Sequence, residues 1–227
     1  MTQRFRNSVS ILVSAALLMM GCSASNTVKG GAIGAGAGAV IGGIIGNQSG
    51  NTVVGAIIGA AVGGTAGALI GNYMDKQAEE MRRDIKGARI ERVGEGIKIT
   101  FDSGLLFETN SARLSSVAEG NIRELATILA KYDDTDILVE GHTDSDGTDA
   151  HNQDLSVQRA EAVAGFAKGR GVKGSRFTTI GYGETQPLGP NTTASGKQEN
   201  RRVEIAVMAN DDLKDAAEDN EEIVPGS

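Results

Sequence analysis

Residues 137–163 read ILVEGHTDSDGTDAHNQDLSVQRAEAV, and the pattern of apolar residues changes twice within them. Ile137 and Val139 mark a strand, and a segment rich in Gly, Asp and Ser follows. Ser156 is then expected to cap a helix whose apolar residues recur at helical spacing, namely Val157, Ala160, Val163, Ala164, Phe166 and Ala167. The stretch therefore predicts a strand, a polar loop and a helix in direct succession.

The same patterns extend over residues 88–208, which we expect to form one globular domain. Further strands are predicted at residues 97–101 and 203–207, where apolar residues alternate, and at residues 177–180, which contain Phe177 and Ile180. A second helix is predicted from apolar residues at helical spacing, namely Leu114, Val117, Ile122, Leu125, Ile128 and Leu129. The expected fold class is α+β, a mixed sheet in a βαβαββ-like order with helices on one face.

Composition limits the possible partners. The 227 residues include 22 Lys and Arg against 29 Asp and Glu, so the formal net charge is −7. Nucleic-acid binding requires clustered positive charge, and no nucleic acid is therefore expected as a partner. The 32 glycines are concentrated in one part of the chain, which indicates one domain with unusual flanks.

The N-terminus has the pattern of a signal peptide. Arg4 and Arg6 precede an apolar run over residues 9–20, and Gly21 provides a small residue before Cys22. The run is shorter than the ~20 apolar residues of a transmembrane helix, so we expect residues 1–21 to be removed.

Cys22, the only cysteine of the chain, is the candidate lipidation site. Met19-Met20-Gly21-Cys22 resembles a bacterial lipobox, although its usual Leu stands one place early, at Leu18. The resemblance implies that Cys22 carries acyl chains such as palmitate, that residues 22–29 form the lipidated N-terminus, and that lipid of the outer membrane holds the protein. Ordinary cleavage that leaves a free thiol is the alternative.

Residues 30–71 contain glycines at strict four-residue spacing in two series: Gly30, Gly34, Gly38, Gly42, Gly46 and Gly50, then Gly55, Gly59, Gly63, Gly67 and Gly71. Residues 47–52 are polar and separate two apolar halves, which predicts a helical hairpin. Small residues four apart let two backbones approach closely, so this glycine zipper would pack in lipid or against partner helices. A flexible spacer is the alternative, but the interleaved Ile and Val favour packing.

Two polar segments flank the domain. Residues 72–87 are expected to form a helical connector with Met74, Ala78, Met81 and Ile85 on one face. Residues 209–227 are rich in acids and contain no aromatic residue, so we expect a disordered tail.

Several motifs of the domain resemble the signature of OmpA-like peptidoglycan-binding domains: Gly141-His142-Thr143-Asp144, Asn152, Arg159-Ala160, Gly181-Tyr182-Gly183-Glu184 and Asn200-Arg201-Arg202-Val203-Glu204-Ile205. With its glycine zipper, the whole chain is similar to the YiaD type of OmpA-family outer-membrane lipoprotein. The resemblance implies a periplasmic, non-catalytic domain that binds the meso-diaminopimelate of peptide stems in peptidoglycan.

The chemistry of that ligand agrees with the residues. The free end of diaminopimelate carries an ammonium and a carboxylate on one carbon, so its receptor requires an acid and an arginine. The resemblance assigns these roles to Asp144 and Arg159, and less directly adds Thr143 and Asn152 as hydrogen-bonding residues. An Asp–Arg pair that only fixes the loop is the alternative.

Other functions fit these residues less well. Residues 144–149 superficially resemble a calcium loop, but Asp149 and Leu155 stand where an EF-hand requires Gly and Glu. His142 and His151 lack the further ligands of a zinc site, and neither forms a recognisable pair of nucleophile and base with a nearby serine. We therefore expect no metal, no cofactor and no catalytic residue. Arg201 and Arg202 could extend an anion site, although one of them is expected to face solvent.

Two functions remain in competition. The first is a tether between the outer membrane and the cell wall. The second is a membrane-inserted homo-oligomer assembled through the glycine zipper, for which wall binding provides only placement.

Overall fold

The computed structural model describes residues 52–108, 110–219 and 225. Within them the strands form one sheet in the order β1-β2-β5-β3-β4. These strands are β1 (Ala88–Val93), β2 (Gly96–Asp102), β3 (Thr135–Gly141), β4 (Phe177–Gly181) and β5 (Arg202–Ala209). β3 and β4 are parallel and the other neighbouring strands are antiparallel, so the expected mixed sheet is confirmed.

The four predicted strands correspond to β2, β3, β4 and β5, whereas β1 was not predicted. β1 has only two large apolar residues, Ile90 and Val93, and its residues alternate between half-buried and exposed over most of its length. This is the burial of an edge strand, which lacks the strong apolar alternation of the interior strands.

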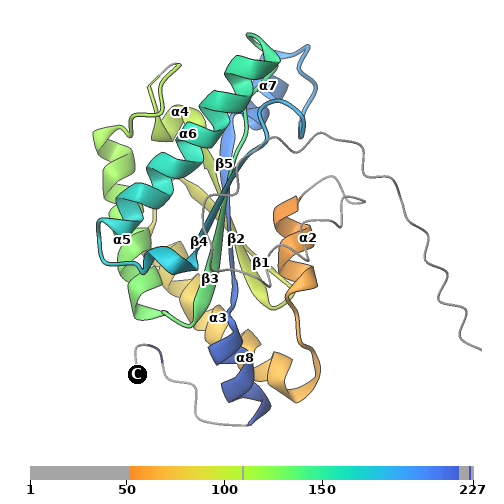
Figure 1. The fold of residues 1–227 in the computed structure, drawn as a ribbon, viewed down its shortest axis with the longest axis vertical. Helices are drawn as coiled ribbons and strands as arrows, with labels where there is room; N and C mark the ends of the chain where they lie inside the picture. The colour runs from red at the N-terminus through yellow and green to blue at the C-terminus, as the bar shows by residue number, and fades with distance from the viewer. Residues whose placement is uncertain (1–51, 109, 220–224, 226–227) are drawn as a thin grey trace, which may run out of the picture.

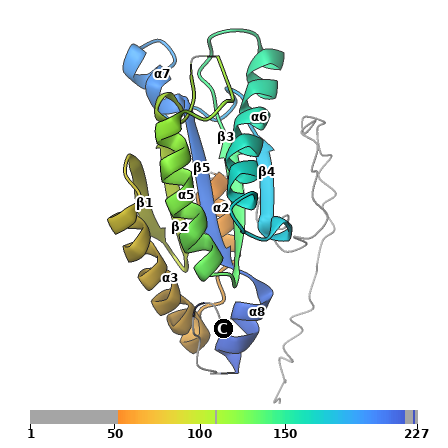
Figure 2. The same cartoon turned by 90° about the vertical axis from the view of Figure 1, so that its left-hand side faces the viewer.

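Three helices cover one face of the sheet, as Figure 2 shows: α3 (Gly64–Asp84), α5 (Ser116–Lys131) and α6 (Asp149–Lys168). Ile122 and Leu125 of α5 and Val163 of α6 belong to the same buried cluster as Ile205 of the central strand β5. The short helices α4 (Ser103–Leu106) and α7 (Ala194–Asn200) and the 3-10 helix η1 (Gly174–Arg176) lie in the connections. The predicted α+β architecture with helices packed on the sheet is therefore confirmed.

The start of α6 differs from the prediction. Its cap is Thr148, whose hydroxyl accepts a hydrogen bond from the amide of His151 at 3.3 Å, so the helix begins before Ser156. Ser156 lies inside the helix and donates to the carbonyl of Gln153 at 2.7 Å. The polar first two turns of α6 hid the helical pattern from the sequence.

Helix α3 contains both zipper and connector residues. It crosses the expected boundary at residue 72 without a break, and it buries Met74, Ala78 and Met81 as the connector was predicted to do. Its start follows two glycines, Gly63 and Gly64, whose φ angles of 77° and 66° are left-handed. The second half of the expected hairpin is thus two helices; the first half lies outside the described residues, as does Cys22.

Helix α2 (Thr52–Gly59) lies on the opposite face of the sheet, which the sequence did not predict (Figure 1). Its Val53, Ala56 and Ile57 form a second buried cluster with Leu138, Ala206 and Met208 of β3 and β5. Both faces of the central strands are therefore covered. Across the described ranges, no helix combines the length and apolar character required to cross a membrane.

The predicted disorder of the acidic tail is wrong for residues 211–218, which form helix α8 (Asp211–Glu218). The side chain of Asn210 caps it by accepting a hydrogen bond from the amide of Leu213 at 2.9 Å. Leu213 and Ala217 are four residues apart and are buried in the main core, where α8 lies beside α3. Two apolar residues at helical spacing were sufficient because a neighbouring helix buries them.

Candidate functional site

A cleft of about 780 Å³ opens where β3 leads into α6. It brings together the four residues that the sequence predicted as ligand-binding, although they come from a loop and a helix. The lining residues are Ser103, Gly104, Phe107, Glu108, Asn110, Ser115, Thr143, Asp144, Asp146, Asn152, Leu155, Arg159 and Arg201. The cleft thus combines acids and arginines with the apolar surface of Phe107 and Leu155.

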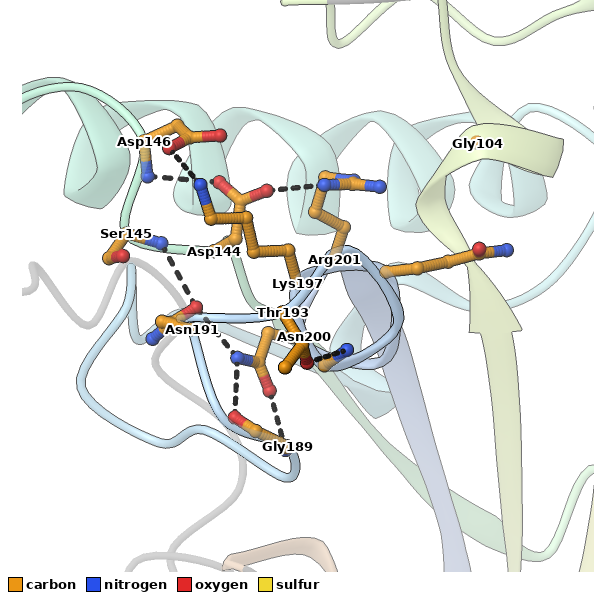
Figure 3. Close-up of polar contacts among 12 residues, drawn as sticks. Gly104, Asp144, Ser145, Asp146, Gly189, Asn191, Thr193, Lys197, Asn200 and Arg201 are labelled. Carbon is orange, nitrogen blue, oxygen red and sulfur yellow. Dashed lines mark hydrogen bonds and ion pairs between the residues drawn. The ribbon is translucent and has the colours of Figure 1, made fainter.

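Asp144 is the acid held most closely within this cleft. Its side chain is 8% exposed, and its carboxylate accepts a hydrogen bond from the amide of Asp146 at 3.1 Å. Its second oxygen binds the guanidinium of Arg201, as Figure 3 shows. The ion pair therefore joins Asp144 to Arg201, whose side chain is 40% exposed, and leaves Arg159 with other partners.

Arg159 is 5% exposed and is held by its Nε, which donates to the carbonyl of Ser111 at 3.1 Å. Its guanidinium lies over the ring of Phe107, with Cζ 5.3 Å from the ring centroid. Burial lowers the pKa of Arg159, the negative charge of Asp144 raises it, and the positive charge of Arg201 lowers it. Because the bond to Ser111 uses Nε, the two terminal nitrogens remain for a bidentate contact with a carboxylate.

Thr143 and Asn152 differ in what they can offer a ligand. The side-chain nitrogen of Asn152 donates to the carbonyl of Asp144 at 3.2 Å and to the carboxylate of Glu184 at 2.6 Å. Asn152 therefore holds the loop that carries Asp144 in place. The hydroxyl of Thr143 is buried and has no hydrogen-bond partner among the described residues. Since a buried unpaired hydroxyl is costly, Thr143 is the better candidate for a direct contact.

Comparisons with known proteins agree with this architecture. Two family models match the chain, the OmpA family over residues 106–201 and the YMGG-like Gly-zipper over residues 1–75. The probable lipoprotein YiaD of Escherichia coli (strain K12) is 37% identical over 210 residues, which are 88% of this chain and 95% of that protein. The chain belongs to the OmpA family.

Two other known proteins match a smaller share of the chain. The outer-membrane lipoprotein YfiB of Pseudomonas aeruginosa is 36% identical over 115 residues, 51% of this chain and 68% of that protein. The solved structure of the cell wall anchor of the T6SS from Pseudomonas aeruginosa is 28% identical, with a TM-score of 0.52 over 62% of this chain and 97% of that one. OmpA-like domains are non-catalytic peptidoglycan-binding domains, so this chain carries a binding module and is not an enzyme.

The OmpA-like cleft includes residues that the sequence left undecided or missed. Arg201 lines the cleft, whereas Arg202 is buried on the other face of the sheet and pairs with Glu204 at 2.8 Å. Arg201, whose side chain is 40% exposed, is the arginine more open to solvent, but it precedes β5 and also lines the cleft. Phe107, Glu108 and Asn110 come from the connection between α4 and α5, where no sequence pattern indicated a site.

A second group of buried polar residues lies under α2, on the far face of the OmpA-like sheet. Glu140, His142 and Glu204 place their possible metal-ligand atoms within 4.8 Å of one another. Lys98 lies 3.2 Å from the carboxylate of Glu204, which Arg202 also binds. Because Lys98 and Arg202 already place two positive charges beside these carboxyl groups, adding a divalent cation would leave excess buried positive charge. We therefore assign no metal to this group.

The protonation states in this group follow from burial. Burial raises the pKa of Glu140 to about 8, while a hydrogen bond from the Thr52 hydroxyl, 2.6 Å long, acts in the opposite direction. Burial and the charges of Arg202 and Lys98 lower the pKa of His142 well below its ordinary value. The ring of His142 stacks on Tyr182 with centroids 5.5 Å apart, so this histidine has a packing role.

Proposed function

We propose that this protein is a non-catalytic tether between the outer membrane and the cell wall. The cleft binds the free end of meso-diaminopimelate in peptide stems, and acyl chains on Cys22 hold the outer membrane, with the OmpA-like domain in the periplasm. The observation that carries the proposal is that one nearly buried acid, Asp144, lines the same cleft as two arginines, Arg159 and Arg201.

The ligand's two charges match this arrangement. The ammonium of diaminopimelate binds the carboxylate of Asp144, and the carboxylate on the same carbon accepts hydrogen bonds from the terminal nitrogens of Arg159. Hydrogen bonds to charged groups contribute ~1.5–3 kcal/mol each, so two such contacts give useful affinity without a large interface. The partly exposed Arg201 neutralises Asp144 before the ligand arrives and can move aside or bind the ligand's carboxylate.

A tether does not require tight binding by each copy. Once the lipid anchor holds one end of the chain near the wall, the effective concentration of the cleft around peptide stems is high. Many copies act in parallel, so dissociation of one cleft does not separate the two layers. The lipoprotein relatives and the cell wall anchor among the solved structures support this function.

The structure gives less support to the zipper-based oligomer. Gly67 is buried on the face of α3 that meets Glu95, where an added side chain would collide with the Glu95 carboxylate. That carboxylate accepts hydrogen bonds from the amides of Val62 and Gly63 at 2.7 and 2.8 Å. Gly67 of the second zipper series therefore packs against its own domain, which favours the tether.

Co-sedimentation of the full chain, in detergent, with isolated sacculi tests the proposal. We expect wild type to sediment with the wall, and folded Asp144→Ala and Arg159→Ala variants to stay in solution. Asp154→Ala and Arg123→Ala are matched controls, because both residues are exposed on α6 and α5. Equal binding by all variants, or no binding by wild type, would refute the tether.

A further inference from the structure

The loop that carries Asp144 is held by a second loop, residues 188–200, which lies between β4 and β5 in the chain and includes α7. Asn191 in that loop uses one side-chain oxygen for two contacts (Figure 3). It accepts a hydrogen bond from the amide of Ser145 at 3.3 Å and another from the side chain of Asn200 at 2.8 Å. Ser145 directly follows Asp144, so Asn191 is connected to the acid of the cleft through one peptide unit.

Asn191 is itself held on the side away from Ser145. Asn200 is fully buried, and its side-chain oxygen accepts hydrogen bonds from the amides of Leu188 and Gly189 at 2.7 and 2.9 Å. Its amide nitrogen also donates to the carbonyl of Gly189 at 2.9 Å. Gly196 of α7 packs so closely on the carbonyl of Pro190 that a Cβ atom would not fit there. These contacts fix the conformation of the second loop, which holds Asn191 in place.

A salt bridge joins the same two loops, but it is the weaker link. The Nζ atom of Lys197 lies 2.6 Å from the carboxylate of Asp146, and the two side chains are 29% and 66% exposed. Ion pairs with this much contact with water contribute little to the position of a loop. The contact between Asn191 and the Ser145 amide is partly buried, and it lies next to Asp144.

We propose that Asn191 is a positioning residue for ligand binding, which fixes the Asp144 carboxylate in place for the ammonium of the ligand. Arg201 follows α7 directly, so the second loop carries Arg201 and also holds Asp144 through Asn191. It thereby sets the distance between an acid and an arginine of the cleft before the ligand binds. A site that is already ordered loses less conformational entropy on binding. This inference rests on the proposed function.

The test uses the full chain and three variants. Asn191→Ala removes the acceptor oxygen, and Asn191→Asp keeps one at the same place. Thr192→Ala is the matched control, because Thr192 is the exposed neighbour in the same loop. Affinity is measured for two peptide stems that contain meso-diaminopimelate, one with its free amine and one in which that amine is acetylated.

Wild type, Asn191→Asp and Thr192→Ala should all prefer the stem with the free amine. Asn191→Ala should bind that stem roughly five- to tenfold more weakly, as expected for a lost hydrogen bond or two, and bind the acetylated stem almost as wild type does. A general loss of protein stability would lower the affinity for both stems equally, so a change in preference between the stems is specific to the positioning of Asp144.

Two results would overturn the inference while leaving the proposed function intact: an unchanged preference in Asn191→Ala, or a preference lost equally in Asn191→Asp. Failure of wild type itself to prefer the free amine would instead refute the recognition of diaminopimelate by Asp144, and the inference would fall with it.

Discussion

Asp144 forms its ion pair with Arg201, the residue that follows α7, and Arg159 on the neighbouring helix is held by the carbonyl of Ser111. The two arginines of the cleft therefore have different states before a ligand binds. Arg201 is partly exposed and neutralises the acid, whereas Arg159 is buried with its terminal nitrogens directed to no protein acceptor among the described residues.

This difference predicts unequal effects of removing the two arginines. Arg159→Gln should weaken binding to sacculi at least tenfold, because a bidentate contact with a carboxylate is lost. Arg159→Lys should not restore binding, since an ammonium lacks the planar fork of a guanidinium. Arg201→Gln should have a smaller effect, because it also frees Asp144 for the ligand. Binding isotherms on sacculi provide the measurement, and a larger loss in Arg201→Gln would contradict this division of roles.

The packing of α3 predicts that the OmpA-like domain is not stable without it. Ile70, Met74 and Met81 are completely buried in the main core, and each such side chain contributes ~1.5–3 kcal/mol on burial. A chain that begins at residue 88 loses all three, together with helix α2, and should melt far below a chain that begins at residue 52. Thermal unfolding followed by circular dichroism measures the difference.

A single substitution in α3 tests the contribution of this helix to stability without removing a segment of the chain. Met74→Ala should lower the free energy of unfolding by ~2–5 kcal/mol, whereas Lys76→Ala at an exposed position of the same helix should change it little. Equal melting of the chains that begin at residues 52 and 88 would show that α3 is dispensable.

The buried Glu140 predicts a pH dependence of stability. Its pKa is about 8 in the folded protein and near 4.5 in an unfolded chain, so between these values the folded state binds more protons. This contribution to stability is present at low pH and is lost as the pH rises to about 8. Glu140→Gln cannot ionise, so its advantage in free energy of unfolding over wild type should grow across this window.

Chemical denaturation of both proteins at several pH values measures that difference. The lowered pKa of His142 has the opposite effect, because it reduces the free energy of unfolding as the pH falls below the ordinary pKa of histidine. His142 is present in both proteins, so its contribution largely cancels in the difference. A difference that stays constant between pH 4.5 and pH 8 would mean that Glu140 is ionised in the folded state throughout.

Two glycines of the second zipper series should respond differently to alanine. An added Cβ at Gly71 meets no atom, so Gly71→Ala should stabilise the protein by up to ~1 kcal/mol through helix propensity. At Gly67 the same gain is offset, because the Cβ displaces the Glu95 carboxylate from the amides of Val62 and Gly63. In a Glu95→Ala background the two substitutions should become equivalent, which a double-mutant cycle of unfolding free energies tests. Equal effects in the wild-type background would indicate that this contact is unimportant.

The sequence predicted the parts of the structure whose determinants are local. Asp144 and Arg159 belong to one continuous strand, loop and helix, so their joint position in a cleft follows from the order of those elements. The interior strands were predicted because their apolar residues alternate or run together, whereas β1 carries only Ile90 and Val93 and was missed.

The remaining features depend on contacts between distant segments. Helix α8 exists because α3 buries Leu213 and Ala217, a contact that the many acids around them concealed. Helix α2 docks on Ala206 at the far face of β5, and the support of Asp144 depends on a hydrogen bond between Ser145 and Asn191, which are 46 positions apart. No periodicity in the sequence reports such pairs.

The most direct test of the central claim is a calorimetric titration of the full chain with two soluble peptide stems, one containing meso-diaminopimelate and one containing L-lysine at the same position. Lysine offers an ammonium without a carboxylate on the same carbon, so it satisfies Asp144 and leaves Arg159 without a partner. The account predicts binding of the diaminopimelate stem, its loss in Asp144→Ala and in Arg159→Ala, and much weaker binding of the lysine stem. Equal affinity for both stems, or binding that survives both substitutions, would contradict it.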